Sequence, residues 1–215
     1  MKKVLIIGAG ISGLYLANLI NKNPTFDFKI IEKRKFLDVS EGYGIQLSVN
    51  SIKLLNKIGF KNISASEINF PSKVNFFQAK NLLKVCEIDL IRFNHEQNKY
   101  STLKRSTLLD FLLNNLPREK IKFNSSIKSY DQINNRVYLD DNSDEIFDFM
   151  VITDGIFSNS KSLVNYQTIK PKYNNCIALR AKIFGYEDRN ISIYMGPDFH
   201  YVIYPVNQNN EYNFI

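Results

Sequence analysis

The sequence predicts an α/β fold in which the strands of a parallel sheet alternate with helices, and three observations support this prediction. A short apolar stretch at residues 4–7 is followed by spaced glycines and a segment with helical periodicity. A second apolar stretch follows at residues 28–33. Strand, helix and strand in this order are typical of a parallel sheet. With 215 residues, of which 44% are hydrophobic, the chain is long enough to bury a sizeable core.

The glycines after the first strand have the spacing GxGxxG, at Gly8, Gly10 and Gly13. In a turn between strand and helix, the first glycine permits the tight bend, the second lets the backbone approach a pyrophosphate, and the third lets helix and strand pack closely. The N–H groups at the start of the helix, which include that of Ser12, then form an anion-binding site. An apolar helix face follows, formed by Leu14, Leu16, Ala17, Leu19 and Ile20.

The second strand ends in Glu32 and Lys33, and Glu32 follows Gly13 by nineteen residues. A carboxylate at this place can accept hydrogen bonds from the ribose hydroxyls of an adenine dinucleotide. The glycine turn and Glu32 together predict a Rossmann-like dinucleotide-binding fold. FAD and NAD both remain open on these residues alone.

The N-terminus also has some features of a secretory signal, because Lys2 and Lys3 precede an apolar run. That alternative requires a small-residue cleavage site, whereas the run leads into NLINKNPTFDFKIIEKR. No uninterrupted apolar stretch reaches the ~18 to 20 residues that span a bilayer. The sequence therefore predicts a soluble, cytoplasmic protein.

Charge and composition exclude several function classes. The formal charge of +7 can favour anionic ligands or acidic membrane surfaces, but the basic residues are dispersed and show no nucleic-acid recognition module. Cys86 and Cys176 are far apart, and His95 and His200 are isolated, so neither a metal site nor a hydrolase triad is expected. We expect both cysteines to be buried, reduced thiols. The oligomeric state is left open.

Two further helices are predicted. Residues 41–60 form a glycine-bearing loop and then a helix that Gly59 ends as a C-cap. Residues 103–116 form an amphipathic helix with Ser106 or Thr107 as its N-cap.

The remaining elements are mainly strands. Residues 147–161 contain a buried strand that ends in Asp154 and Gly155. A hairpin precedes it, with Asn134 and Asn135 at its turn. Period-two alternation predicts further strands at residues 74–79, 191–195 and 200–206.

In this order the segments resemble the aromatic-ring hydroxylases, which are FAD-dependent monooxygenases of the para-hydroxybenzoate and salicylate hydroxylase type. The resemblance covers essentially the whole chain and favours FAD over NAD as the tightly held dinucleotide. It rests on GAGISG with Glu32, the GxGIxL stretch at 42–47, Arg105, the DGxxS run at 154–158, and the pair Tyr204 and Pro205.

The resemblance implies roles for several residues. The glycine turn with Ser12, and Glu32 with Lys33, are expected to hold the ADP half of FAD, with Arg105 beside its phosphate or ribityl oxygens. Asp154 and Gly155 are expected near the pyrophosphate and to take part in binding reduced nicotinamide. The alternatives are a solvated arginine at a helix start and an ordinary strand-ending turn.

The implied activity is hydroxylation of a phenol or aromatic carboxylate, with NAD(P)H as reductant, O2 as oxidant and no metal. The choice between NADH and NADPH, the substrate and the position hydroxylated are left open. Tyr194, His200 and Tyr201 either face the flavin or pack as ordinary sheet residues. No catalytic residue is assigned.

The chain departs from the family pattern at two points. Lys161 stands where the family commonly has arginine, which keeps the charge but loses the bidentate fork. The family's later Gly-Asp motif is not present, and the final residues EYNFI have the pattern of a strand in mid-course. We therefore expect the N-terminal portion of a longer enzyme.

The expected organisation is a Rossmann-like FAD/NAD(P)-binding domain with an inserted, incomplete β-sheet substrate domain. The first comprises residues 1–70 and 94–165, and the second residues 71–93 and 166–215. Three alternatives remain: a quinone-biosynthesis hydroxylase acting at a membrane surface, an NAD-dependent dehydrogenase, and a non-catalytic nucleotide-binding remnant. Arg105 and the DGxxS run argue against the dehydrogenase.

Overall fold

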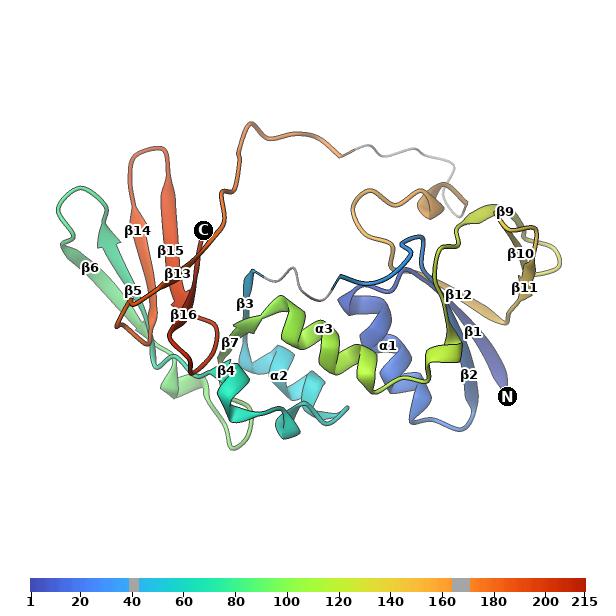
Figure 1. The fold of residues 1–215 in the computed structure, drawn as a ribbon, viewed down its shortest axis with the longest axis horizontal. Helices are drawn as coiled ribbons and strands as arrows, with labels where there is room; N and C mark the ends of the chain where they lie inside the picture. The colour runs from blue at the N-terminus through green and yellow to red at the C-terminus, as the bar shows by residue number, and fades with distance from the viewer. Residues whose placement is uncertain (39–42, 164–170) are drawn as a thin grey trace. The chain divides into compact units, whose positions relative to one another are not determined.

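The computed structural model describes residues 1–38, 43–163 and 171–215, which form two compact units (Figure 1). Unit 1 consists of Met1–Asp38 and Leu109–Asn175, and unit 2 of Val39–Leu108 and Cys176–Ile215. Each unit is therefore built from two separate stretches of the chain.

These units divide the chain differently from the predicted domains. Residues 43–70 and 94–108 belong to unit 2, whereas the predicted FAD-binding domain contains them together with the glycine turn. The division into an FAD-binding domain and a substrate domain stays a prediction. Gly42, the first residue of the GxGIxL stretch, lies outside the described residues.

Unit 1 is built on a parallel sheet with the strand order β12-β1-β2-β8. Its strands are β1 (Lys2–Ile7), β2 (Phe26–Ile31), β8 (Ile121–Lys122) and β12 (Phe149–Ile152). Residues 4–7 of β1 are all buried, because β1 lies between two partner strands. The predicted α/β fold and its buried first strand are thus confirmed.

Different elements cover the two faces of this sheet. α1 (Ile11–Asn21) packs on one face, where Gly13 lies against the side chain of Ile6. On the other face, Leu5 and Ile7 pack against Val137 of a three-stranded antiparallel sheet. Because alternate residues of a strand point to opposite faces, β1 has to be apolar on both. The antiparallel strands are β9 (Ile127–Asp131), β10 (Arg136–Leu139) and β11 (Asp144–Ile146).

The hairpin prediction is confirmed, and the burial prediction for the following strand is wrong. Asn135 has a φ of +48° in the β9–β10 turn, and the Asp131 carboxylate accepts a hydrogen bond from the N–H of Asn134. β12 is half buried rather than buried, with Phe149 48% exposed. The reason is that β12 is an edge strand of the described sheet.

Unit 2 contains a six-stranded sheet with the order β13-β16-β15-β14-β5-β6. All neighbouring strands are antiparallel except β14 and β5, which run parallel with Ile191 opposite Val74. The strands predicted in this region are confirmed. The bounds are β5 (Lys73–Gln78), β6 (Lys84–Asp89), β13 (Ala181–Phe184), β14 (Ile191–Met195), β15 (His200–Pro205) and β16 (Glu211–Phe214).

A smaller antiparallel sheet, in the order β3-β7-β4, completes unit 2 with α2 (Val49–Asn56). Its strands are β3 (Gly44–Leu47), β4 (Ile68–Asn69) and β7 (Ser101–Lys104). The helix predicted within 41–60 is confirmed. The predicted C-cap is wrong, because Lys57 caps α2, and Gly59, two residues further on, turns the chain with a left-handed φ of +100°.

The helix predicted at 103–116 begins later than expected, as α3 (Arg105–Asn114). Leu103 belongs to β7, where it pairs with Ile45 and Ile68 and is fully buried. Ser106 and Thr107 therefore lie within the first turn of α3, and neither is its N-cap.

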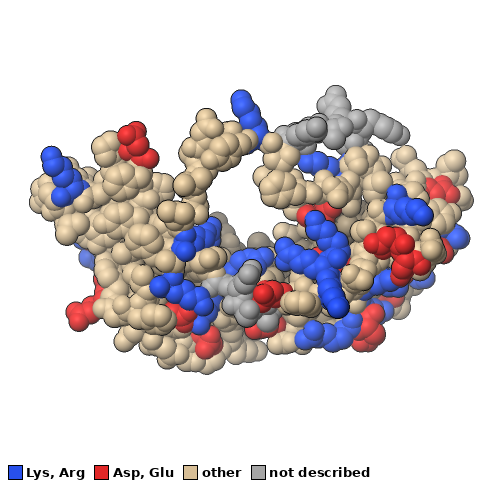
Figure 2. All heavy atoms as spheres, turned by 45° about the horizontal axis from the view of Figure 1, so that its top comes forward, with Lys and Arg blue, Asp and Glu red and all other residues tan. Residues whose placement is uncertain are grey.

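The prediction of two buried cysteines is wrong, because Cys86 and Cys176 are both exposed. Cys86 lies in β6, an edge strand whose residues are all exposed. Among the described residues, no helix is long and apolar enough to cross a membrane. In the same ranges, no group of three or more His, Cys, Asp or Glu residues is placed to hold a metal ion. Figure 2 shows Lys and Arg side chains scattered among Asp and Glu on the face in view.

Candidate dinucleotide-binding site

The turn after β1 is tight and requires glycine at its first position. Gly8 has a φ of +101°, and a Cβ there would lie 2.8 Å from both the Cα of Asp154 and the carbonyl oxygen of Thr153. The N–H of Gly8 donates to the carbonyl of Ile31, and the N–H of Thr153 to that of Ile7, both at 2.8 Å. The turn is therefore fixed between β2 and β12.

The next two glycines differ in their surroundings. A Cβ on Gly13 would lie 2.1 Å from the carbonyl oxygen of Gly8 and 2.7 Å from the Thr153 Oγ1, so α1 rests directly on the turn. Gly10, the N-cap of α1, has no atom within 4 Å of the position of its missing Cβ. No side chain forms a capping hydrogen bond at the N-terminus of α1. The N–H groups of the first turn of α1 therefore face open space at Gly10.

Glu32 follows β2 and directs its carboxylate into this turn. Its side chain accepts hydrogen bonds from the N–H of Ala9 at 2.7 Å and from the N–H of Arg34 at 2.9 Å. Glu32 is buried, with 7% of its surface exposed. An ionised carboxylate has about four acceptor positions, so positions remain for the hydroxyls of a ligand.

The end of β12 brings a second carboxylate. The Oδ2 of Asp154 accepts from the N–H of Ser160 at 3.3 Å, whereas its Oδ1 is buried without a hydrogen-bond partner. Gly155 follows with a φ of +87° and open space around its missing Cβ. Because a buried acceptor without a donor is costly, Oδ1 is suited to a hydroxyl or a water.

A pocket of about 410 Å³ joins the start of α1 to the DGxxS run within unit 1. Its lining residues are Ser12, Ile152, Thr153, Asp154, Gly155, Ser158 and Lys161. The N–H of Lys161 donates to the Ser158 Oγ at 3.0 Å, which holds the run in a compact turn. The pocket thus combines the positive end of α1 and a lysine with the carboxylate of Asp154. This combination suits a ligand that carries both anionic oxygens and hydroxyls.

Comparison with known proteins shows which proteins share these features. Residues 6–37 match the model of an NAD(P)-binding Rossmann-like domain. Two curated relatives are the FAD-dependent monooxygenases dpfgE of Gibberella zeae, 26% identical over 174 residues, and dpchE of Colletotrichum higginsianum, 27% identical over 177 residues. Each match covers 74% of this chain and 35% of the relative, so the chain spans about a third of their length.

Solved structures show the same fold. HpxO of Klebsiella pneumoniae, in complex with FAD and uric acid, superposes with a TM-score of 0.85 at 17% identity. A salicylate hydroxylase substrate complex superposes with a TM-score of 0.80, also at 17% identity. Each covers 99% of this chain and 55% of the solved chain. Over about three quarters of its length, the chain is similar to curated FAD-dependent monooxygenases, and its fold is that of the solved hydroxylase.

The residues present fit the cofactor of these monooxygenases. The space in front of Gly10 and the uncapped start of α1 suit a diphosphate, whose oxygens only accept hydrogen bonds. The carboxylates of Glu32 and Asp154 would repel phosphate but suit hydroxyls, of which a dinucleotide carries several. The site thus offers hydrogen-bond donors for the phosphates of a dinucleotide and hydrogen-bond acceptors for its hydroxyls.

Two predicted residues of the monooxygenase site are not brought to this turn by the described contacts. Lys33 is exposed beside Glu32. Arg105 belongs to unit 2, where its N–H donates to the carbonyl of Tyr43 at 2.9 Å and its side chain is half buried. Their contacts with a cofactor stay predictions.

The three aromatic candidates on the sheet do not share one face. Tyr194 and Tyr201 stack at 4.6 Å between ring centroids, in a row that continues to Phe77 on one side and Phe214 on the other. His200 precedes Tyr201 in β15 and therefore points to the opposite face. Stacking of this kind between neighbouring strands is typical of side chains that pack along a sheet.

Sequence reasoning missed Thr153, which ties the glycine turn to β12. Its Oγ1 lies 2.8 Å from the carbonyl oxygen of Ile7 and 3.0 Å from that of Gly8. The available signal was a hydroxyl residue directly before the Asp-Gly pair, at the end of a strand that neighbours the glycine turn.

Proposed function

We propose that the chain binds FAD and carries the cofactor-binding part of an NAD(P)H-dependent monooxygenase that hydroxylates a phenol or an aromatic carboxylate. The observation that supports this most is the Glu32 carboxylate held in the glycine turn, 2.7 Å from the N–H of Ala9. The balanced reaction consumes an aromatic C–H, NAD(P)H, a proton and O2, and yields a phenol, NAD(P)+ and water.

Each group of the turn has a role in this proposal. The N–H groups at the start of α1 and the ammonium of Lys161 bind the diphosphate. Glu32 accepts hydrogen bonds from ribose hydroxyls, and the Oδ1 of Asp154 accepts one from a hydroxyl or a bound water. The chemistry that FAD supplies when bound is two-electron transfer from NAD(P)H and activation of O2.

The finer parts of the proposal rest on the family. HpxO was solved with uric acid, and the salicylate hydroxylase with its substrate, which supports a small aromatic substrate here. NAD(P)H as the reductant, a cytoplasmic location and contact with an anionic membrane are retained as predictions. His200 is retained as a candidate residue near the substrate.

FAD binding is tested with the full chain and three variants. We expect the purified protein to hold FAD, measured by flavin absorbance and by titration of flavin fluorescence. Gly10→Val places a side chain in the open space, and Glu32→Gln removes the charge, so each should weaken binding about tenfold or more. Glu119→Gln removes an exposed carboxylate of unit 1 and should leave the affinity unchanged. A cooperatively folded wild-type chain that binds no FAD would overturn the proposal.

The reaction is tested separately. NADH and NADPH oxidation and O2 uptake are measured with and without phenolic acids, and the products are identified by mass spectrometry. Substrate-stimulated oxidation with incorporation of one oxygen atom supports hydroxylation. FAD-loaded protein that shows no stimulation by any aromatic acid would refute this activity for the chain and support the nucleotide-binding remnant.

A further inference from the structure

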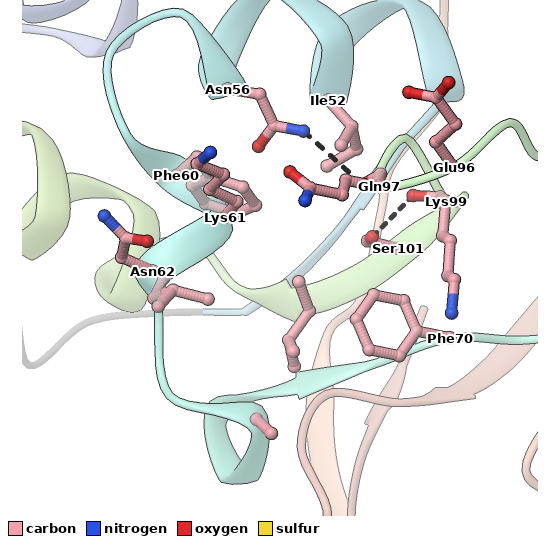
Figure 3. A pocket seen from close by; sticks show the side chains of 13 residues that line it. Ile52, Asn56, Phe60, Lys61, Asn62, Phe70, Glu96, Gln97, Lys99 and Ser101 are labelled. Atoms are coloured by element: carbon pink, nitrogen blue, oxygen red, sulfur yellow. Dashed lines mark hydrogen bonds between the residues drawn. The ribbon is translucent and has the colours of Figure 1, made fainter.

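A second cavity, which we call the α2 pocket, lies in unit 2 between α2, β4 and the turn at residues 95–98. It has a volume of about 500 Å³, within the range of small-molecule sites (Figure 3). Its lining comes from residues 52–70 and 96–101. None of the residues assigned above to FAD is part of it.

The floor of the α2 pocket is apolar. Ile52, Phe60 and Ile68 line it and are each at most 4% exposed. Phe70, also a lining residue, is 47% exposed, a large fraction for an aromatic ring. A ligand that covers this ring and the floor removes apolar surface from water, which favours binding.

The charge around the α2 pocket is positive. Two lysines, Lys61 and Lys99, line it against one acidic residue, Glu96. Figure 3 shows Lys61 beside Phe60 on one side and Lys99 beside Phe70 on the other. The Lys99 Nζ lies 5.6 Å from the centre of the Phe70 ring. Neither lysine forms an ion pair with any described residue, so both are available to an anion.

One wall of the pocket is held in place before any ligand arrives. The Asn56 Nδ2, on α2, donates to the carbonyl of Gln97 at 3.4 Å (Figure 3). It also donates to the Oδ1 of Asn98 at 3.0 Å. The N–H and carbonyl of His95 also bond those of Asn98, which closes the turn. Glu96 has a φ of +49° there, a conformation that non-glycine residues adopt rarely and that is enriched at binding sites. Such preorganisation reduces the ordering cost of binding.

We propose that the α2 pocket binds an aromatic monoanion, with its planar body on Phe60, Ile68 and Phe70 and its carboxylate or sulfonate at Lys61 or Lys99. The two lysines favour an anion over a neutral molecule of the same shape. Glu96 disfavours a second negative charge on the ligand. This site is separate in its residues from the FAD site and does not depend on the proposed hydroxylase activity.

The test uses 2-naphthoate as the probe and 2-naphthalenemethanol as its neutral counterpart. Because the chain contains no Trp, naphthoate fluorescence is measured without tryptophan emission, and calorimetry gives the stoichiometry. Lys61→Gln and Lys99→Gln should each weaken naphthoate binding about threefold to tenfold. Lys53→Gln removes an exposed charge from α2 outside the pocket and should change it less than about twofold.

A blocking variant separates this pocket from any other aromatic site. Ala65 lines the pocket and is exposed, so Ala65→Trp fills the cavity from its edge. Because this variant adds a Trp, its naphthoate binding is measured by calorimetry and not by fluorescence. It should abolish naphthoate binding while leaving FAD affinity and the circular dichroism spectrum unchanged. If this variant fails to fold, the double variant Lys61→Gln/Lys99→Gln decides the question, with Lys53→Gln as the control.

Several results would overturn the proposal. They are the absence of saturable naphthoate binding at low millimolar concentration, equal binding of the neutral counterpart, and unchanged binding in a folded Ala65→Trp variant. Loss of FAD binding in Gly10→Val with unchanged naphthoate binding would show that the two sites bind their ligands independently.

Discussion

The glycine turn of unit 1 is built mainly from backbone groups, whereas the α2 pocket of unit 2 is built mainly from side chains. The turn uses backbone groups, and its geometry depends on side chains that are missing at Gly8, Gly10 and Gly13. The α2 pocket uses side chains from α2, β4 and the turn at residues 95–98. A site built from backbone groups can thus be recognised in the sequence by glycines at a fixed spacing. A site built from side chains depends on which strands pair, and the paired strands are far apart in the sequence.

The largest effect is expected at Gly13. Gly13→Ala places a Cβ 2.1 Å from the Gly8 carbonyl oxygen, so α1 must move, and we expect the unfolding free energy to fall by about 3 kcal/mol. Gly10→Ala meets no atom within 4 Å and should change it by less than about 1 kcal/mol. Urea unfolding of the two variants measures this contrast. Equal losses in both would show that the turn is not organised by contact.

A smaller loss is expected when the same change is made in unit 2. A Cβ on Gly44 would lie 2.7 Å from side-chain atoms of Tyr204 and Val206 and 2.6 Å from the Cβ of Asn213. Because side-chain atoms can shift more than a backbone carbonyl, we expect Gly44→Ala to cost about 2 kcal/mol. Thermal and urea unfolding check this value. A cost above that of Gly13→Ala would reverse the comparison between the two units.

Glu32→Gln is expected to have a moderate effect on stability. The amide keeps one acceptor oxygen but presents an NH2 group to one of the two backbone N–H donors, those of Ala9 and Arg34. Loss of one charge-assisted bond should cost about 1–2 kcal/mol without any ligand. Hydrogen exchange at the Ala9 amide is a direct measurement. Unchanged protection there would contradict the assigned bond.

The smallest effect concerns the pH dependence at the exposed edge of unit 2. Hydrogen bonds from Lys73 and then Lys84 hold the pKa of Glu87 at about 2, against an ordinary value of 4.5. A carboxyl group whose pKa is lowered in the folded state adds stability above its ordinary pKa and loses it as the pH falls towards 2. Glu87→Gln should therefore make the unfolding free energy depend slightly less on pH between pH 4.5 and 2 than in the wild-type chain. Acid titrations followed by circular dichroism compare the two.

The sequence predicted unit 1 better than unit 2 for physical reasons. The first strand, the glycine turn, α1 and Glu32 occupy 31 consecutive positions counted from Lys2 to Glu32, and local steric rules connect them. The helix start at Arg105 was predicted less well, because Leu103 fits an amphipathic helix as well as a strand. Only its pairing with Ile45 and Ile68 decides between them.

The unexpected exposure of Cys86 and the missed pocket have the same cause, which is strand pairing. Cys86 is exposed because β6 is the last strand of its sheet, and strand order does not follow from composition. The α2 pocket forms because β4, two residues long, pairs with β7 and places Ile68 near the turn at 95–98. A strand that short has no readable alternation.

The parallel pairing of β5 with β14 has a consequence for biosynthesis. The two strands are brought together although the second stretch of unit 1 lies between them in the chain. During translation β5 and β6 leave the ribosome long before β14, so the edge of β5 that pairs with β14 has no partner strand until β14 has been made. Because pairing over such a separation in the chain forms slowly, the edge of β5 that later pairs with β14 stays without its partner strand for much of synthesis.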